Sequence, residues 1–130
     1  VSVEKARKVN ASAIAAGRCA VRQASVAELP FEAEQFDVVT AFETVYFWPE
    51  LAQNFREVYR VLKPGGTFFI CNEANGETAK DDKWTQIING MTIYTDADLK
   101  VYLEQAGFGK AQSHKNKKGW LCVTAQKAVK

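Results

Sequence analysis

Apolar residues recur every three to four positions in the first part of the chain, which is the spacing of one face of an α-helix. They are Val3, Ala6, Val9, Ala13 and Ile14, and Gly17 follows them as a stop signal. The pattern predicts an amphipathic helix over residues 2–16. After the glycine, the β-like residues 19–24 predict a short strand.

A near-continuous apolar run follows an acidic turn and extends from Phe36 to Phe42. Consecutive apolar positions are typical of strands that are buried on both faces of a parallel sheet. This run is therefore predicted to be the central strand.

The next segments alternate helix and strand. Apolar positions return to helical spacing between Pro49 and Leu62, and Lys63-Pro64-Gly65-Gly66 is predicted to end that helix in a glycine turn. Residues 67–71 are again apolar and predict a buried strand. A strand, a helix and a strand with short links form a βαβ unit, so the two strands are expected to be parallel with a right-handed crossover.

The last third of the chain predicts a helix and a hairpin after a polar stretch. Residues 72–90 are the least regular part, with a helix expected near 82–88. Residues 95–98 have the pattern of a capping box, which predicts a helix with Leu99, Tyr102, Leu103 and Ala106 facing inward, ended by Gly107 and Phe108. Strands near 110–114 and 120–126 are joined by a polar turn and predict an antiparallel hairpin.

Composition places these elements in one domain. The 130 residues, 47% hydrophobic and 25% charged, suit a single globular domain over residues 1–130 and exclude collagen-like, coiled-coil and disordered classes. No apolar run approaches a membrane span and no signal peptide is visible, so we expect a soluble, cytoplasmic domain without a membrane partner.

The net charge of +2 hides a segregated distribution, since residues 23–55 carry six acidic and no basic side chains. Such a segment does not suit a nucleic-acid surface. The lysines at 110, 115, 117 and 118 lack interleaved aromatic residues and are expected to form a solvated face. No nucleic-acid partner is therefore expected.

Three cysteines, Cys19, Cys71 and Cys122, lie in β-like runs without a CxxC spacing. An odd count at these spacings supports neither a disulfide framework nor a zinc site, so buried free thiols are expected. The one histidine, His114, lies in a lysine-rich segment and is expected at the surface. No metal is predicted.

Four segments, in this order and spacing, resemble the class I S-adenosylmethionine-dependent methyltransferases of the small-molecule type. They are Ala24-Ser25-Val26-Ala27-Glu28-Leu29-Pro30-Phe31, Phe36-Asp37-Val38-Val39, Arg60-Val61-Leu62-Lys63-Pro64-Gly65-Gly66 and Leu103-Glu104-Gln105-Ala106-Gly107-Phe108. The resemblance implies an α/β, Rossmann-like fold with a mostly parallel sheet and a C-terminal antiparallel hairpin. It also implies S-adenosylmethionine as cofactor and methyl transfer to a small molecule.

The family resemblance also implies where ligands bind. Ala24, Ser25 and Val26 match the segment that contacts the adenine, where the family usually has Asp at the position of Ser25; a neutral hydroxyl accepts a weaker hydrogen bond than a carboxylate. Phe42, Glu43 and Thr44 match the loop along the methionine arm of the cofactor. Tyr46, Trp48 and Glu73 are expected to line the acceptor pocket, because ligands of open α/β sheets bind at the carboxyl ends of strands.

Among these residues, Glu43 and Glu73 are the carboxylates best placed to orient or deprotonate an acceptor, although Glu43 is equally consistent with a solvated helix start. One of the adjacent aromatic residues 46–48 is expected to pack in the core, and at least one to form an apolar or cation-binding wall of the pocket. Ordinary packing is expected for Trp84 and Trp120.

The glycine-rich loop of the family and the acidic residue after its second strand have no match in the chain. We therefore expect the chain to correspond to the C-terminal two-thirds of such a domain, truncated at the N-terminus, with a gap in the sheet between residues 19–24 and Phe36. A fragment of this kind is either inactive alone or, alternatively, a non-catalytic interaction module that forms homo-oligomers through exposed strand edges. A nicotinamide-binding fold matches the same segments less well.

Overall fold

The computed structural model describes residues 2–77 and 79–129, which form a four-stranded sheet in the order β1-β2-β4-β3. The strands are β1 (Phe36–Phe42), β2 (Leu62–Asn72), β3 (Gly109–Lys115) and β4 (Leu121–Gln126). β1 and β2 are parallel, whereas β4 is antiparallel to both β2 and β3. The helices are α1 (Ser2–Val9), α2 (Ala11–Ala15), α3 (Leu51–Val61), α4 (Ala79–Ile87) and α5 (Asp96–Gln105), with a 3₁₀ turn η1 (Val45–Phe47). The predicted α/β class, the parallel βαβ unit and the C-terminal hairpin are confirmed.

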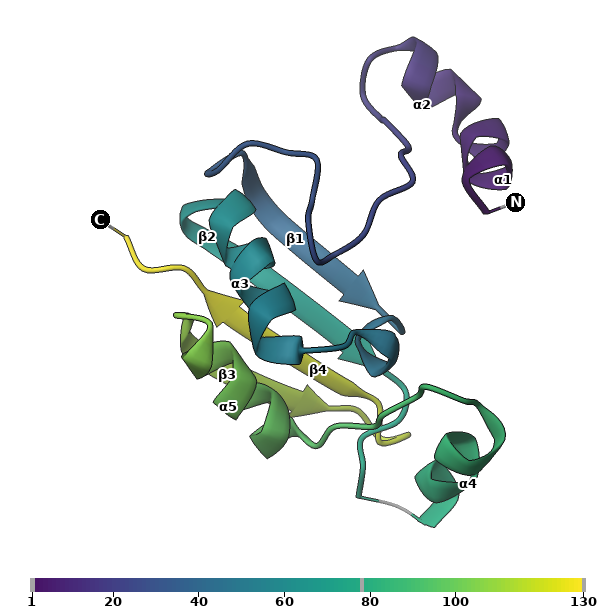
Figure 1. Cartoon of the computed structure of the whole chain (residues 1–130), viewed down its shortest axis with the longest axis vertical. Coiled ribbons are helices and arrows are strands. Elements are labelled where there is room, and N and C mark those ends of the chain that lie inside the picture. The colour runs from purple at the N-terminus through teal and green to yellow at the C-terminus, as the bar shows by residue number, and fades with distance from the viewer. Residues whose placement is uncertain (1, 78, 130) are drawn as a thin grey trace.

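The helices take up three different positions around this sheet. α3 and α5 lie against the same face, α4 lies beyond the carboxyl ends of β1 and β2, and α1 and α2 stand apart from the sheet (Figure 1). The core therefore forms between one face of the sheet and α3 and α5, while α4 can contribute to a site at the strand ends.

The core is dominated by aromatic and aliphatic side chains that converge from the helices and the sheet. Phe55 of α3 and Phe68 of β2 are fully buried, with their ring centroids 5.4 Å apart. Leu99 and Leu103 of α5 are also fully buried in the same cluster, as the sequence predicted. Burial of each such side chain contributes about 2 kcal/mol, which holds both helices on the sheet.

Both ends of α5 follow the predicted sequence signals. Thr95 Oγ1 accepts from the Asp98 N–H and Asp98 Oδ2 accepts from the Thr95 N–H, each at 3.1 Å, which completes the capping box. At the other end, Gly107 has a φ of +104°, and the Phe108 N–H donates to the Leu103 carbonyl at 3.0 Å. These bonds satisfy backbone groups that the helix itself leaves free.

The junction between α3 and β2 differs from the predicted glycine turn. Residues 63–66 already belong to β2, and Gly65 (φ +83°) forms a bulge in which its N–H donates to the Lys127 carbonyl at 2.9 Å. A Cβ on Gly66 would lie 2.9 Å from the Lys63 carbonyl oxygen. The glycines are therefore needed for a β-bulge and a close backbone approach within the strand.

The predicted helix over residues 2–16 is divided into α1 and α2 at Asn10. The Asn10 side-chain amide donates to the Ala6 carbonyl at 2.8 Å and so competes with the backbone for that acceptor. Neither helix contains a buried residue. Gly17 (φ +77°) ends α2 as predicted, with the Arg18 N–H donating to the Ala13 carbonyl at 2.9 Å.

The predicted strand at residues 19–24 is wrong, because this segment is irregular in the structure. A strand requires a neighbour with which to exchange main-chain hydrogen bonds, and within the described residues the four strands of the sheet pair only with one another. Cys19 therefore lies in a loop and not in a strand.

The prediction of a central, doubly buried β1 is also wrong for the described residues. β1 is an edge strand, and Val38 and Phe42 are each 57% exposed, whereas Ala41 on the helix-covered face is buried. A continuous apolar run shows that both faces can be buried, but the strand order decides which of them is covered.

Candidate functional site

The carboxyl ends of the two parallel strands are joined by Glu43. Its N–H donates to the Cys71 carbonyl at 2.9 Å, and its side-chain carboxylate accepts a hydrogen bond from the Glu73 N–H. Glu43 adopts a φ of +57°, a left-handed conformation that costs a non-glycine residue about 1 kcal/mol. The two hydrogen bonds offset this cost, so the end of β1 and the end of β2 are fixed relative to each other.

Tyr46 of η1 extends this connection towards the loop that follows β2. Its hydroxyl accepts from the Ala74 N–H at 2.9 Å and donates to Glu43 Oε1 at 3.4 Å. Burial, with the nearby carboxylates of Glu43 and Glu73, raises the pKa of Tyr46 above its ordinary value. The phenol therefore stays protonated at neutral pH and acts as a hydrogen-bond donor.

These groups form one wall of a cavity of about 720 Å³ at the carboxyl ends of β1 and β2. The other lining residues come from the loop after β2, from α4 and the segment that follows it, and from the β3–β4 loop. The lining residues are Glu43, Tyr46, Phe47, Glu73, Ala74, Asn75, Asp81, Trp84, Ile88, Met91, Lys118, Gly119 and Trp120. A lining that combines aromatic and aliphatic side chains with polar groups is typical of small-molecule sites.

The carboxylates of this cavity differ in their surroundings. Asp81 accepts from the N–H groups of Asn75 (3.1 Å) and Gly76 (2.7 Å), so it holds the loop that follows β2. Glu43 is engaged by Glu73 and Tyr46, as described above. Glu73 is exposed, and its carboxylate has no hydrogen-bond or ion-pair partner among the described residues, so it is the carboxylate most available to a ligand.

The structure brings Glu43, Tyr46 and Glu73 together in this cavity, but it places Trp48 elsewhere. The Trp48 ring stacks on Phe68 (centroids 6.4 Å apart, planes at 7°) and lies 6.0 Å from Phe55, in the core. Phe47 lines the cavity in its place. The backbone here is a 3₁₀ turn with three residues per turn, so positions 46 and 48 do not share a face as they would in a strand.

Trp84 and Trp120 were expected to pack in the ordinary way, and this expectation is wrong. They are 50% and 40% exposed, and both line the cavity. No local pattern could have assigned them to the site, because each lies far along the chain from Glu43 and Tyr46. Only the position of α4 and of the β3–β4 loop at the strand ends brings them there.

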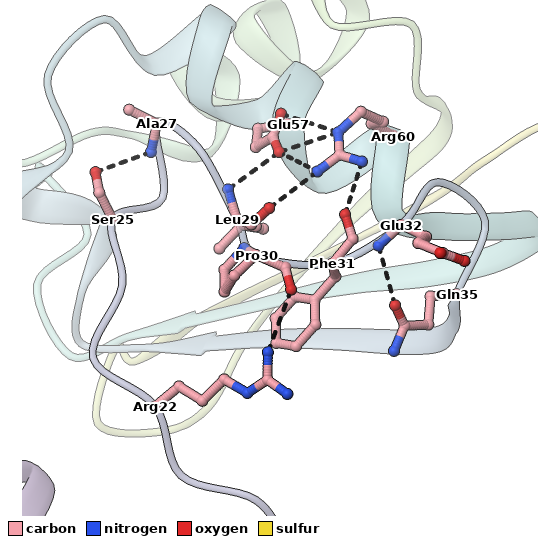
Figure 2. Close-up of polar contacts among 10 residues, drawn as sticks. All are labelled: Arg22, Ser25, Ala27, Leu29, Pro30, Phe31, Glu32, Gln35, Glu57 and Arg60. Carbon is pink, nitrogen blue, oxygen red and sulfur yellow. Dashed lines mark hydrogen bonds and ion pairs between the residues drawn. The ribbon is translucent and has the colours of Figure 1, made fainter.

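The predicted adenine segment lies outside this cavity. Ser25 Oγ accepts from the Ala27 N–H at 3.1 Å in a tight turn (Figure 2), and Val26 packs against the core. Ala24 and Ser25 are exposed. None of the three lines the cavity, so the structure separates them from the predicted acceptor residues.

The residues predicted to contact the methionine arm of the cofactor do not all lie on the same side of the sheet. Glu43 lines the cavity, whereas the Phe42 ring lies 5.9 Å from Phe69, on the face that α3 and α5 do not cover. Thr44 is exposed and precedes η1.

The turn at Ser25, in the predicted adenine segment, is followed by residues that a polar network connects to α3 (Figure 2). The sequence did not reveal this network. The Arg60 guanidinium donates to the carbonyls of Leu29 (3.1 Å) and Phe31 (2.9 Å) and to Glu57. Glu57 in turn accepts from the Leu29 N–H at 3.1 Å. Through these contacts α3 holds the segment Leu29-Pro30-Phe31 in place.

At the end of β2, Asn72 is fully buried, and neither polar atom of its side-chain amide has a hydrogen-bond partner among the described residues. Residues 2–77 and 79–129 contain no group of three His, Cys, Asp or Glu side chains arranged to hold a metal ion. In the same part of the chain, no helix is long and apolar enough to cross a membrane.

Comparison with known proteins adds the family. A family model described as a methyltransferase domain matches residues 1–70. The chain is 33% identical over 91 residues to "Sterol methyltransferase-like 3" of Botryococcus braunii, covering 68% of this chain and 23% of that protein. It is also 33% identical over 91 residues to the ubiquinone/menaquinone biosynthesis C-methyltransferase UbiE of Bartonella henselae, covering 65% of this chain and 35% of that protein.

Among solved structures, the S-adenosylmethionine-dependent methyltransferase SibL matches with a TM-score of 0.78 and 20% identity, over 96% of this chain and 40% of that one. At this identity the likeness shows the fold alone. The chain spans about a quarter to a third of the length of the two curated relatives.

Proposed function

The chain belongs to the class I S-adenosylmethionine-dependent methyltransferases, and from this premise we propose that the protein transfers a methyl group from S-adenosylmethionine to a small, largely apolar acceptor bound in the cavity at the strand ends. The observation that carries the proposal is the convergence of Tyr46, Phe47, Trp84 and Trp120 with the carboxylates of Glu43 and Glu73 around one cavity.

The residues that match the family's cofactor contacts suit S-adenosylmethionine in exposure and charge. Ala24, Ser25, Phe42, Glu43 and Thr44 are all exposed, so a ligand can reach them. The segment that contains them, residues 23–55, carries six acidic and no basic side chains. An acidic surface attracts a cofactor whose sulfonium and ammonium groups leave it with a net positive charge.

In this proposal, Ser25 and the neighbouring backbone hold the adenine edge, and Glu43 and Thr44 border the methionine arm. S-adenosylmethionine supplies an electrophilic methyl group on its sulfonium sulfur. The transfer is an in-line displacement, for which positioning of the nucleophile at about 3–3.5 Å provides much of the rate enhancement. The protein's part is therefore chiefly to hold the acceptor in one orientation.

Different lining residues have different roles in holding the acceptor in that orientation. Phe47, Trp84 and Trp120 provide flat apolar surface for the body of the acceptor. The protonated Tyr46 hydroxyl and the Glu43 carboxylate lie together in the cavity lining. Glu73, exposed and without a partner among the described residues, accepts a hydrogen bond or a proton from the acceptor.

The relatives support an apolar acceptor, since one is named a sterol methyltransferase-like protein and another a ubiquinone/menaquinone C-methyltransferase. Both names favour catalysis over a non-catalytic interaction module. We include in the proposal a cytoplasmic location and, through the exposed edge of β1, association of two copies as a secondary feature.

Calorimetric titration of S-adenosylhomocysteine into the protein expressed from its whole coding sequence tests the proposal. We expect saturable binding at one site, weakened about tenfold by Ser25→Ala because a hydrogen-bond acceptor is lost. Ser12→Ala, on the exposed surface of α2, is the matched control and should bind as the unchanged protein does.

Activity is measured with methyl-labelled S-adenosylmethionine and either a sterol or a quinol as acceptor. Transfer of label that depends on Glu73 but not on Glu104, an exposed carboxylate of α5, is the expected result. Absence of both S-adenosylhomocysteine binding and label transfer would overturn the proposal.

A further inference from the structure

Two cysteines that are 51 positions apart in the chain face each other across the sheet. Cys71 of β2 and Cys122 of β4 are direct register partners in the antiparallel pair. The Cys122 thiol donates to Cys71 Sγ at 3.5 Å. Neither residue belongs to the cavity described above, and the sequence pattern alone does not pair them.

The hydrogen-bond ladder shows which kind of pair they form. The Lys127 N–H donates to the Gly66 carbonyl at 2.9 Å, so Gly66 and Lys127 form a hydrogen-bonded pair. From there the register continues without a shift to Asn72, and antiparallel pairs alternate between hydrogen-bonded and non-hydrogen-bonded. Cys71 and Cys122 therefore form a non-hydrogen-bonded pair.

This kind of pair suits a covalent cross-link. Cα atoms of non-hydrogen-bonded partners are about 4.5 Å apart, and their side chains lie closer than in the other class. Disulfides span Cα separations of about 4.4–6.8 Å. The two sulfurs thus need only a small approach to reach bonding distance, without a change in strand register.

Both thiols are within reach of a small oxidant. Cys71 and Cys122 are half-buried. Phe68 and Ile70 of β2 point into the core, so Cys71, at the position after Ile70, faces the other side of the sheet. The thiols therefore project from the opposite face of the sheet. α3 and α5 leave that face uncovered (Figure 1). Cys19 lies in the irregular segment after α2, outside the sheet that contains the other two cysteines.

We propose that Cys71 and Cys122 are a site of reversible oxidative modification, at which a low-molecular-weight disulfide such as oxidised glutathione converts the two thiols into an intramolecular disulfide. One protein thiolate attacks a glutathione sulfur and displaces the first glutathione thiolate. The second protein thiolate attacks the cysteine sulfur of the resulting mixed disulfide and displaces the second glutathione thiolate. One disulfide is reduced, one is formed, and the two protons of the cysteines end on the two released glutathiones.

The environment of the pair makes the exchange slow at neutral pH. Burial raises the pKa of Cys71, and the Cys122 thiol on β4 and the carboxylates of Glu43 and Glu73 raise it further. The thiolate is the attacking species, so the rate increases with pH. The site therefore responds to sustained oxidation and not to brief exposure.

Oxidation at this site acts on the cavity walls through the backbone. Glu73 lies two residues after Cys71 and Trp120 two residues before Cys122, and both line the cavity. A cross-link between β2 and β4 at this level fixes the spacing of those two segments. The inference itself rests on the sheet register and does not depend on the proposed activity.

Incubation of the protein with excess oxidised glutathione, followed by intact mass spectrometry and peptide mapping, tests the site. We expect the loss of two hydrogen masses, one cross-linked peptide pair containing Cys71 and Cys122, and full reversal by dithiothreitol. The oxidised form should melt roughly 5–15 °C higher, because the cross-link restricts the unfolded chain.

Three variants separate the pair from the remaining cysteine. Cys19→Ser should form the cross-link as the unchanged protein does, whereas Cys71→Ser and Cys122→Ser should lose it. If Cys71 and Cys122 both stay open to alkylation after oxidation of the unchanged protein, or if the cross-link includes Cys19, the proposal is overturned. Because that mapping uses the unchanged protein, poor folding of a variant does not affect the outcome.

Discussion

The guanidinium of Arg60 donates to the main-chain carbonyl of Leu29 at 3.1 Å, although the two residues are 31 positions apart. The same group reaches the Phe31 carbonyl and is itself held by Glu57 (Figure 2). A single side chain on α3 thus fixes the segment that follows the turn at Ser25. The helix and the turn are therefore coupled through main-chain acceptors, whose positions do not depend on the side chains of the turn.

Replacement of Arg60 tests this coupling. Arg60→Ala should lower the melting temperature by about 5 °C, because two carbonyls and a carboxylate lose their donor. Arg60→Lys should recover only part of the loss, since an ammonium group cannot reproduce the planar fork. Arg56→Ala is the control, because Arg56 makes one exposed bond of 3.3 Å to the Gln105 carbonyl; a loss equal to that of Arg60→Ala would contradict the prediction.

The same network predicts a contribution to acid sensitivity. The Arg60 guanidinium beside Glu57 holds the pKa of that carboxyl below its usual range. A depressed pKa in the folded state means that the stabilisation is present above the unfolded pKa of about 4.3 and is lost as pH falls through the folded value.

Melting temperatures measured between about pH 7 and pH 3 should therefore fall less steeply for Glu57→Gln than for the unchanged protein. Glu104→Gln, at an exposed position of α5, should follow the unchanged protein. Parallel curves for all three proteins would show that Glu57 does not contribute to the acid dependence.

Lys127 stabilises the C-terminal end of α3 from a distant part of the chain. Its ammonium donates to the carbonyls of Tyr59 and Leu62 at 2.9 Å each, and the residue is only 8% exposed. Lys127→Met keeps the apolar stem but leaves both carbonyls without this donor, so we expect a loss of about 2 kcal/mol in the free energy of unfolding by urea. Lys117→Met, at an exposed position, should change it by less than about 0.5 kcal/mol.

Phe47 and Trp48 should separate binding from stability, although they are adjacent. Trp48→Ala removes a ring stacked on Phe68 and should cost about 3 kcal/mol in the free energy of unfolding. Phe47→Ala removes a side chain that is 48% exposed, so its cost should stay below about 1 kcal/mol while the KM for the acceptor rises. Urea unfolding and acceptor kinetics on both variants check this contrast, and equal costs in stability would contradict it.

Local signals predicted the elements well where the determining contacts lie within one element. The Thr95–Asp98 capping box and the Gly107 ending of α5 were both confirmed, because each bond joins residues a few positions apart. The alternation of strand and helix around Phe36 and Leu62 likewise predicted the parallel pair. The division of the first helix at Asn10 was missed, since helical periodicity does not show when a side-chain amide competes for a backbone carbonyl.

The candidate site was predicted only in part, because several of its residues are brought together by contacts between distant parts of the chain. Glu43 and Glu73 follow parallel strands, and the carboxyl ends of parallel strands meet at one edge, so their proximity follows from the topology. Trp48 was expected in the pocket with Tyr46 from the family resemblance, but in a 3₁₀ turn positions 46 and 48 do not share a face. Trp84 and Trp120 reach the cavity through the positions of α4 and the β3–β4 loop, which no local pattern contains.

The sequence by itself determined the α/β class, the order of helices and strands, the ends of α5 and the family motifs, because periodicity, caps and motifs act over a few residues. Only the tertiary structure decided which face of β1 is covered, which lysine stabilises the end of α3 and which cysteines face each other. Those outcomes depend on strand order and register, which are set by packing of the whole sheet against α3 and α5. A shift of one residue in the β2–β4 register would separate Cys71 from Cys122 and leave every local pattern unchanged.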